Sequence, residues 1–175
     1  MGRIKKQPPV KLITGFIFKG GEYFCKAKQG LRKNFGEIDF ESQEIPFNHT
    51  DYYQKEFGPS LKRKFISFKR LITPQSIVET KIITNRIEVR LSKDSLRRIN
   101  IDPGYIDMAK LVLASTKDFR HRIYLNKGIF AEIALFYQNK SFRPWEWSYP
   151  DYRTQEYFEI FNQIRKIYAS QIKNI

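Results

Sequence analysis

One stretch of the chain, residues 100–122, holds the side chains best suited to transfer a proton. His121 is one of only 2 histidines, and histidine changes its charge near neutral pH. Asp102 and Asp118 each supply a carboxylate that would orient the His121 imidazole if the chain folds back to bring them together. These three residues are the candidate catalytic groups for acid–base chemistry.

The same stretch carries candidate anion-binding residues. Lys117 and Arg122 stand on either side of His121 and have the charges that hold a phosphate or a carboxylate. Tyr105 and Lys110, which lie earlier in the stretch, are further candidate ligand-binding residues. Loops that follow strands are where α/β folds place ligand groups, so this stretch is a natural place for a site.

Each of these residues also has a purely structural interpretation. An aspartate before Pro103 is common in turns, and Asp102 would then only shape the chain. His121 would begin a strand and bond a nearby backbone carbonyl. Both interpretations stay open, because the sequence does not show whether the two ends of the stretch meet.

An aromatic segment, residues 145–153 (WEWSYPDYR), precedes the C-terminal helix that we expect. Such a cluster commonly pins a helix onto a sheet, because large aromatic rings bury much apolar area. Tyr149 and Asp151 would alternatively contribute ligand-binding groups to a cleft. These two residues complete the set of candidate ligand-binding residues.

Sequence motifs for metals and phosphate loops give little support to either kind of site. His49 and Asp51, together with Asp118 and His121, would make a two-histidine, two-carboxylate metal set, but such spacings arise often by chance. We therefore predict no metal site. The glycine-rich loops that bind nucleotide phosphates are absent from the sequence, which leaves the cofactor undefined.

The charge of the chain points to anionic partners. Its 175 residues include 32 Lys and Arg against 18 Asp and Glu, which gives a formal net charge of +14. Such an excess favours partners such as RNA or a nucleotide. The same composition also follows from an AT-rich genome or a hot habitat, so a compositional origin of the charge is the alternative.

The sequence predicts a cytoplasmic protein that does not enter a membrane. No apolar run approaches the roughly 20 residues that span a bilayer. Residues 1–9 are basic, lack a signal-peptide pattern and are expected to be flexible. The single cysteine, Cys25, excludes an intramolecular disulfide.

Hydrophobic patterning predicts an α+β fold in one domain, residues 1–175. The first part reads as a ferredoxin-like βαββαβ sheet, extended by a C-terminal β-hairpin and a long terminal helix. The expected strands are 10–18, 38–47, 61–72, 96–101, 121–125 and 129–137, with a short strand near 142. The expected helices are 22–35, 74–92, 108–115 and 151–173, with a strand as the alternative for the second half of 74–92.

Three local features support these boundaries. Asp102-Pro103-Gly104 predicts a turn that ends a strand, and Asp107 predicts the N-cap of a short helix. The segment 126–128 (NKG) predicts a three-residue hairpin turn.

Several segments resemble the bacterial domain-of-unknown-function 4416 family. The resemblance covers most of the chain, in order, through DYY (51–53), GPSLKRKF (58–65), NIDPGYI (100–106), KLVLASTKD (110–118), HRIYLNKGIFAEIAL (121–135) and WSYPDYR (147–153). It implies that the family pattern includes the Asp102 turn and the Lys117–Arg122 segment, whereas His49 lies outside that pattern.

The leading hypothesis from the sequence is binding of a phosphorylated or anionic ligand, a nucleotide or RNA. Lys117, His121 and Arg122 would hold the anion, with Asp102 and Asp118 positioning it. The alternatives are an acid–base enzyme that uses His121 and a protein-interaction scaffold. Convergence of the candidate residues around a cleft would favour the first two over the third.

Overall fold

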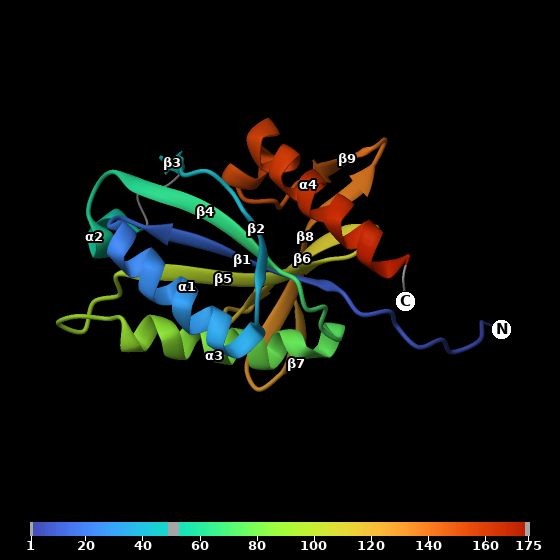
Figure 1. Cartoon of the computed structure of the whole chain (residues 1–175), viewed down its shortest axis with the longest axis horizontal. Coiled ribbons are helices and arrows are strands. Elements are labelled where there is room, and N and C mark those ends of the chain that lie inside the picture. Colours follow the sequence, from blue (N-terminus) through green and yellow to red (C-terminus); the bar gives the residue numbers. More distant parts are fainter. Residues whose placement is uncertain (1, 49–52, 174–175) are drawn as a thin grey trace.

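The structure of the chain is a computed structural model that describes residues 2–48 and 53–173. Within these residues, strands form one antiparallel sheet (Figure 1). The strands are β1 (Lys11–Phe18), β2 (Ile38–Glu41), β3 (Ile45–Phe47), β4 (Leu61–Phe68), β5 (Ile99–Ile106), β6 (Lys110–Ser115), β7 (Ile123–Asn126), β8 (Ile129–Gln138) and β9 (Ser141–Pro144). The helices are α1 (Gly21–Phe35), α2 (Gln54–Phe57), α3 (Ile77–Arg90) and α4 (Gln155–Ile172).

The strand order confirms the α+β prediction and its ferredoxin-like core. The order is β2-β4-β1-β5-β6-β8-β7, with β3 beside β4 and β9 beside β8. The first four strands of this order alternate with α1 and α3 along the chain in the βαββαβ pattern. Helices α1 and α3 cover one face of the sheet, and α4 lies on the other (Figure 1).

Strand β1 is buried on both faces of the sheet, which explains its continuous apolar sequence. Leu12 and Phe16 of this strand pack with residues of α1 and α3, whereas Ile13 packs with residues of α4. Successive side chains of a strand point to opposite faces, so a strand between two helical layers must be apolar throughout. Each fully buried large apolar side chain contributes roughly 1.5–3 kcal/mol to folding.

The predicted turn at Asp102-Pro103-Gly104 is wrong, because β5 runs straight through it. Gly104 pairs with Leu113 of β6, and a Cβ atom at Gly104 would lie 2.4 Å from the Val112 carbonyl oxygen. The glycine is therefore required by the close approach of β6 and not by a turn. Pairing between β5 and β6 begins at Gly104, so Pro103 stands outside that ladder.

The helix predicted for residues 108–115 is also wrong, because this segment forms strand β6. The Asp107 carboxylate accepts hydrogen bonds from the backbone N–H groups of Ala109 and Lys110 at 2.7 and 2.8 Å. A side chain of this kind satisfies a tight turn as readily as it caps a helix. The apolar run that follows is covered on both faces, as a short central strand requires.

The hairpin of β7 and β8 forms, with a turn shorter than predicted. Its corner is the pair Lys127-Gly128, whose φ angles of 50° and 74° are those of a two-residue type I′ turn. Further along β8, the pairing with β6 shifts so that Ala134 is an extra, bulged residue. The bulge turns Glu132 inward, to 4% exposure, and leaves Ile133 38% exposed.

The remaining elements follow the sequence closely. Helix α3 is helical through Arg90, so the strand alternative for its second half is wrong. Helix α4 begins after Thr154, whose side chain accepts a hydrogen bond from the Tyr157 amide. The segment predicted as one irregular strand, 38–47, is divided into β2 and β3, and residues 49–52 lie outside the described part of the chain.

Candidate functional site

A cavity of about 470 Å³ opens on the α4 face of the sheet. Five of the predicted site residues line it: Asp102 on β5, Lys117 and Arg122 between β6 and β7, and Tyr149 and Asp151 before α4. The two ends of the 100–122 stretch therefore meet in space. They do so because β5 and β6 are neighbours, and the chain returns along β6 to the level of Asp102.

The most deeply buried charge of this cavity belongs to Arg63 of β4. Its Nη1 donates to the Asp102 carboxylate at 3.2 Å, and its Nη2 donates to the Tyr152 hydroxyl at 2.7 Å. Room for the guanidinium comes from Gly15 on β1, where a Cβ atom would lie 3.0 Å from Nη2. The sequence gives one signal of this burial. Arg63 is two residues from both Leu61 and Phe65, so on a strand its side chain points to the same inward face as theirs.

The surroundings of Arg63 compensate its burial. Burial opposes the guanidinium charge, but Tyr152, Tyr157, Asp151 and Asp102 outweigh it and raise the pKa of Arg63 well above its usual value. The guanidinium also lies 4.8 Å from the ring centre of Phe65, a cation–π contact. The cavity thus has a permanent positive charge at its floor.

A second group of charged side chains is centred on Glu132. Its Oε2 accepts from Arg122 Nε at 2.7 Å and lies 3.1 Å from His121 Nε2. Arg122 also donates to the hydroxyls of Tyr149, at 2.5 Å, and Ser115, at 3.0 Å. These bonds fix the Arg122 guanidinium at the side of the cavity. Burial raises the pKa of the Tyr149 phenol.

The carboxylate partner of His121 differs from the two that the sequence predicted. Glu132 of β8 occupies that place, whereas Asp102 bonds Arg63 and Asp118 is exposed at the surface. Glu132 was missed because it interrupts an apolar strand, and the bulge that turns it inward leaves no local signal in the sequence. The pairing of His121 with Asp102 or Asp118 is therefore corrected to a pairing with Glu132.

The aromatic segment before α4 packs against the same histidine. Trp147 stacks on His121, with ring centres 5.9 Å apart and planes 16° apart. Trp145 stacks in turn on Trp147 at 5.0 Å, and Trp147 Nε1 donates to the Ile133 carbonyl at 3.1 Å. The segment thus holds the His121 ring in place while its later residues line the cavity.

The structure does not bring the other candidates into this cavity. Tyr105 follows Gly104, so its side chain points to the opposite face and packs with the cluster under α1 and α3. Lys110 forms an ion pair with Asp107 at 2.7 Å. Neither Asp118 nor His121 is among the residues that line the cavity, although His121 contacts the lining residue Glu132.

The residues that the structure describes contain no group of three or more His, Cys, Asp and Glu side chains that could hold a metal ion. His49 and Asp51, which belonged to the metal set considered from the sequence, lie outside those residues. No helix in residues 2–48 and 53–173 is long and apolar enough to cross a membrane.

The charges that line the cavity are balanced. Three cations (Arg63, Lys117 and Arg122) face three carboxylates (Asp102, Glu132 and Asp151). Aromatic and apolar side chains complete the walls: Ile17, Phe47, Tyr53, Leu113, Tyr149 and Tyr152. Such a lining offers both donors and acceptors of hydrogen bonds beside ring surfaces, as small-molecule sites do.

Comparison with known proteins found no match among curated proteins or solved structures. A family model does match, over residues 8–168, and its description is domain of unknown function (DUF4416). The match spans the ferredoxin-like core, the hairpin and most of α4, and therefore every residue of the cavity. It confirms the resemblance seen in the sequence, and the chain belongs to the DUF4416 family.

Proposed function

We propose that this protein binds a nucleotide-sized ligand, with an anionic group and a hydrogen-bonding ring, in the cavity beside Arg63. One observation carries the proposal: side chains from β4, β5, the β6–β7 connection and the segment before α4 converge on a single cavity of about 470 Å³. Pockets that enclose small organic ligands have volumes of about 300–1,000 Å³.

The anionic group is assigned to Lys117 and Arg122. Arg122 is held by Glu132 and Tyr149, so its guanidinium plane is oriented before a ligand arrives. A fixed guanidinium loses little conformational entropy when it binds a phosphate or a carboxylate. Lys117, an exposed residue that lines the cavity, adds a second positive charge.

The ring is assigned to the inner part of the cavity. Asp102 and Asp151 can accept hydrogen bonds from ring N–H groups, and Tyr53 and Tyr149 provide aromatic surfaces. Because the three carboxylates offset the three cations, a ligand with one or two negative charges is favoured over a triphosphate. The volume of about 470 Å³ also favours a single nucleotide over a polymer.

Titration calorimetry tests the proposal with nucleoside monophosphates, the matching nucleosides, sugar phosphates and inorganic phosphate. We expect Lys117→Ala to weaken binding of the phosphorylated compounds by about tenfold and to leave nucleoside binding unchanged, because only the anion loses its partner. Lys166→Ala, an exposed lysine on α4, is the matched control. If none of these compounds binds in a salt-dependent way, the proposal is overturned.

Acid–base catalysis is the second candidate function, and the contact between His121 and Glu132 favours it. Glu132 lines the cavity and would relay a proton between a bound ligand and the imidazole. Incubating the protein with each compound that binds, and following the products by phosphorus NMR, tests this function. Turnover that is lost in His121→Gln supports it, and binding of every compound without turnover eliminates it.

A further inference from the structure

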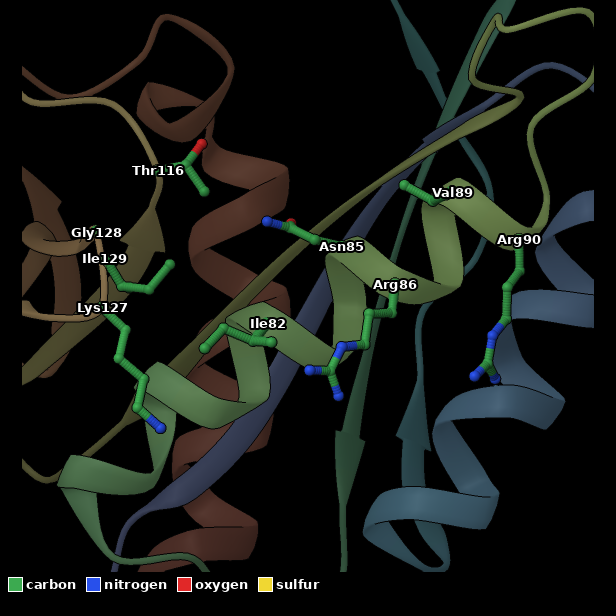
Figure 2. A pocket seen from close by; sticks show the side chains of 9 residues that line it. All are labelled: Ile82, Asn85, Arg86, Val89, Arg90, Thr116, Lys127, Gly128 and Ile129. Carbon is green, nitrogen blue, oxygen red and sulfur yellow. The ribbon is translucent and has the colours of Figure 1, made fainter.

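A second groove lies on the opposite face of the sheet, between α3 and the β7–β8 turn (Figure 2). Its volume is about 460 Å³. Thr116 lines this groove, whereas its neighbour Ser115 lines the cavity described above, because successive residues at the end of β6 point to opposite faces. The groove is therefore separate from the candidate site.

Two arginines stand on the outer side of this groove. Arg86 and Arg90 are exposed, one turn apart on α3, and neither forms an ion pair within residues 2–48 and 53–173. Like charges at this spacing repel each other by a few tenths of a kcal/mol. The nearby carboxylates do not relieve them, since Glu79 bonds Lys127 and Glu88 is buried. The pair is thus suited to an anionic partner from outside the chain.

Helix α1 extends the positive charge. It packs against α3 at Gly30, where an added Cβ atom would lie 3.4 Å from Ile87 Cδ1. Lys33 is exposed on α1 and has no ion-pair partner among the residues that the structure describes. Arg90 extends from α3 on the side where α1 lies (Figure 2). Exposed cations therefore stand on both of these packed helices, and we refer to Lys33, Arg86 and Arg90 together as the α1–α3 face.

The groove beside this face also offers neutral hydrogen-bonding groups. Asn85 of α3 and Thr116 of β6 both line it, and neither side chain makes a hydrogen bond within the described part of the chain. Ile82, Val89 and Ile129 provide its apolar lining. These groups match the parts of a nucleic acid strand. The cations on the rim suit its phosphates, the amide and hydroxyl suit its ribose hydroxyls, and the apolar carbons suit its bases.

We propose that this groove and the α1–α3 face bind the backbone of a single-stranded RNA. Arg86 and Arg90 contact successive phosphates, and Asn85 and Thr116 contact ribose 2′-hydroxyls. A membrane surface fits less well, because an interfacial helix presents a continuous apolar face, whereas the outer side of α3 carries arginines. The usual mode of ferredoxin-like RNA-binding domains, with bases stacked on an open sheet, is blocked here by α4.

Fluorescence polarisation with labelled single-stranded RNA, the same sequence as DNA, and anionic vesicles tests this proposal in the full-length protein. The double variant Arg86→Glu/Arg90→Glu is compared with Lys166→Glu/Arg143→Glu, which makes the same charge change at exposed positions on α4 and β9. We expect the first variant to weaken RNA binding at least about tenfold. This variant should also make the plot of log binding constant against log salt concentration less steep by about 1.4. The two lost phosphate contacts each account for about 0.7 of that slope in a single strand.

A second variant, Asn85→Ala/Thr116→Val, leaves the charge unchanged and should remove the preference for RNA over DNA. Nucleotide binding in the cavity should be the same in all these variants, so failure of this proposal is distinguishable from failure of the proposed function. Equal loss of RNA binding in the two charge variants, tighter binding to DNA or to vesicles, or no RNA binding at all would each overturn it.

Discussion

Arg63 and Asp102 meet across Gly15, with Nη1 and Oδ2 3.2 Å apart. Gly15 of β1 pairs with Asp102 on one side and with Phe65 on the other, so the missing side chain of Gly15 opens a passage between β4 and β5. The Arg63 side chain is 2% exposed and that of Asp102 is 28% exposed. The pair thus joins the interior of the sheet to the mouth of the cavity.

Filling this passage should disturb the pair. In Gly15→Ala the new Cβ atom would lie 2.9 Å from Phe65 Cε1 and 3.0 Å from Arg63 Nη2, so the Phe65 ring and the guanidinium would both have to shift. We expect the free energy of unfolding in urea to fall by about 1–3 kcal/mol, as for other overpacked cores. Gly21→Ala is the control, because nothing lies within 4 Å of its added Cβ atom. Equal stability of the two variants would contradict the assigned role of Gly15.

Removing one partner of the pair should be worse than removing both. Asp102→Ala leaves the buried Arg63 charge without its carboxylate, and we expect a loss of about 2 kcal/mol, less than for a fully buried pair because Asp102 is partly exposed. Arg63→Leu/Asp102→Ala should recover part of that loss. A double-mutant cycle from urea unfolding measures the coupling, and additive effects of the two substitutions would show that the contact contributes nothing.

Glu132 should be the most sensitive carboxylate of the site. Glu132→Leu leaves the largely buried side chains of Arg122 and His121 without their shared acceptor, and we expect a loss of about 3–5 kcal/mol in unfolding free energy. Glu132→Gln keeps an acceptor and should lose only about 1–2 kcal/mol. The exposed Glu146→Leu should change stability by less than about 0.5 kcal/mol. A similar small effect in Glu132→Leu would contradict this account.

Two carboxylates that share Arg97 should respond oppositely to pH. Burial raises the pKa of Glu88 above 4.5, so the folded state binds more protons than the unfolded state there, and the contribution of Glu88 to stability falls as pH rises. Hydrogen bonds from Arg97 lower the pKa of Glu56, so its contribution is present above 4.5 and is lost as pH falls.

Unfolding free energies measured from acid to neutral pH test the predicted pH dependence of the Glu88 and Glu56 contributions. Stability of Glu88→Gln relative to the native protein should increase as pH rises through the titration of Glu88. Stability of Glu56→Gln relative to the native protein should decrease as pH rises toward 4.5. Parallel curves for either variant and the native protein would show that the folded environment leaves that carboxylate unchanged.

The sequence predicted the fold better than the site. Alternating strands and helices were found because apolar periodicity is a local property, as in β1 and α4. Pro103 and Gly104 were misread as a turn, since the need for glycine came from contact with Val112, a neighbour known only after folding. Asp107 was misread as a helix cap because a tight turn uses the same hydrogen bonds.

The site was predicted in part, for a similar reason. Asp102, Lys117 and Arg122 were found because polar residues cluster there in the sequence, and the adjacency of β5 and β6 then joined them. Arg63 lay among other basic residues that carry no such burial, and only its phase with Leu61 and Phe65 distinguished it. Glu132 points inward because of a bulge in β8, and the sequence pattern of β8 does not predict that bulge.

The burial of Arg63 has a consequence for synthesis on the ribosome. Its partner Tyr152 follows 89 residues later in the chain, just ahead of α4. Until that segment has emerged, the guanidinium keeps its water, and the α4 face of the nascent sheet remains open. The α4 face of the N-terminal βαββαβ portion is therefore exposed to chaperones and proteases until the segment from Tyr152 through α4 has been translated.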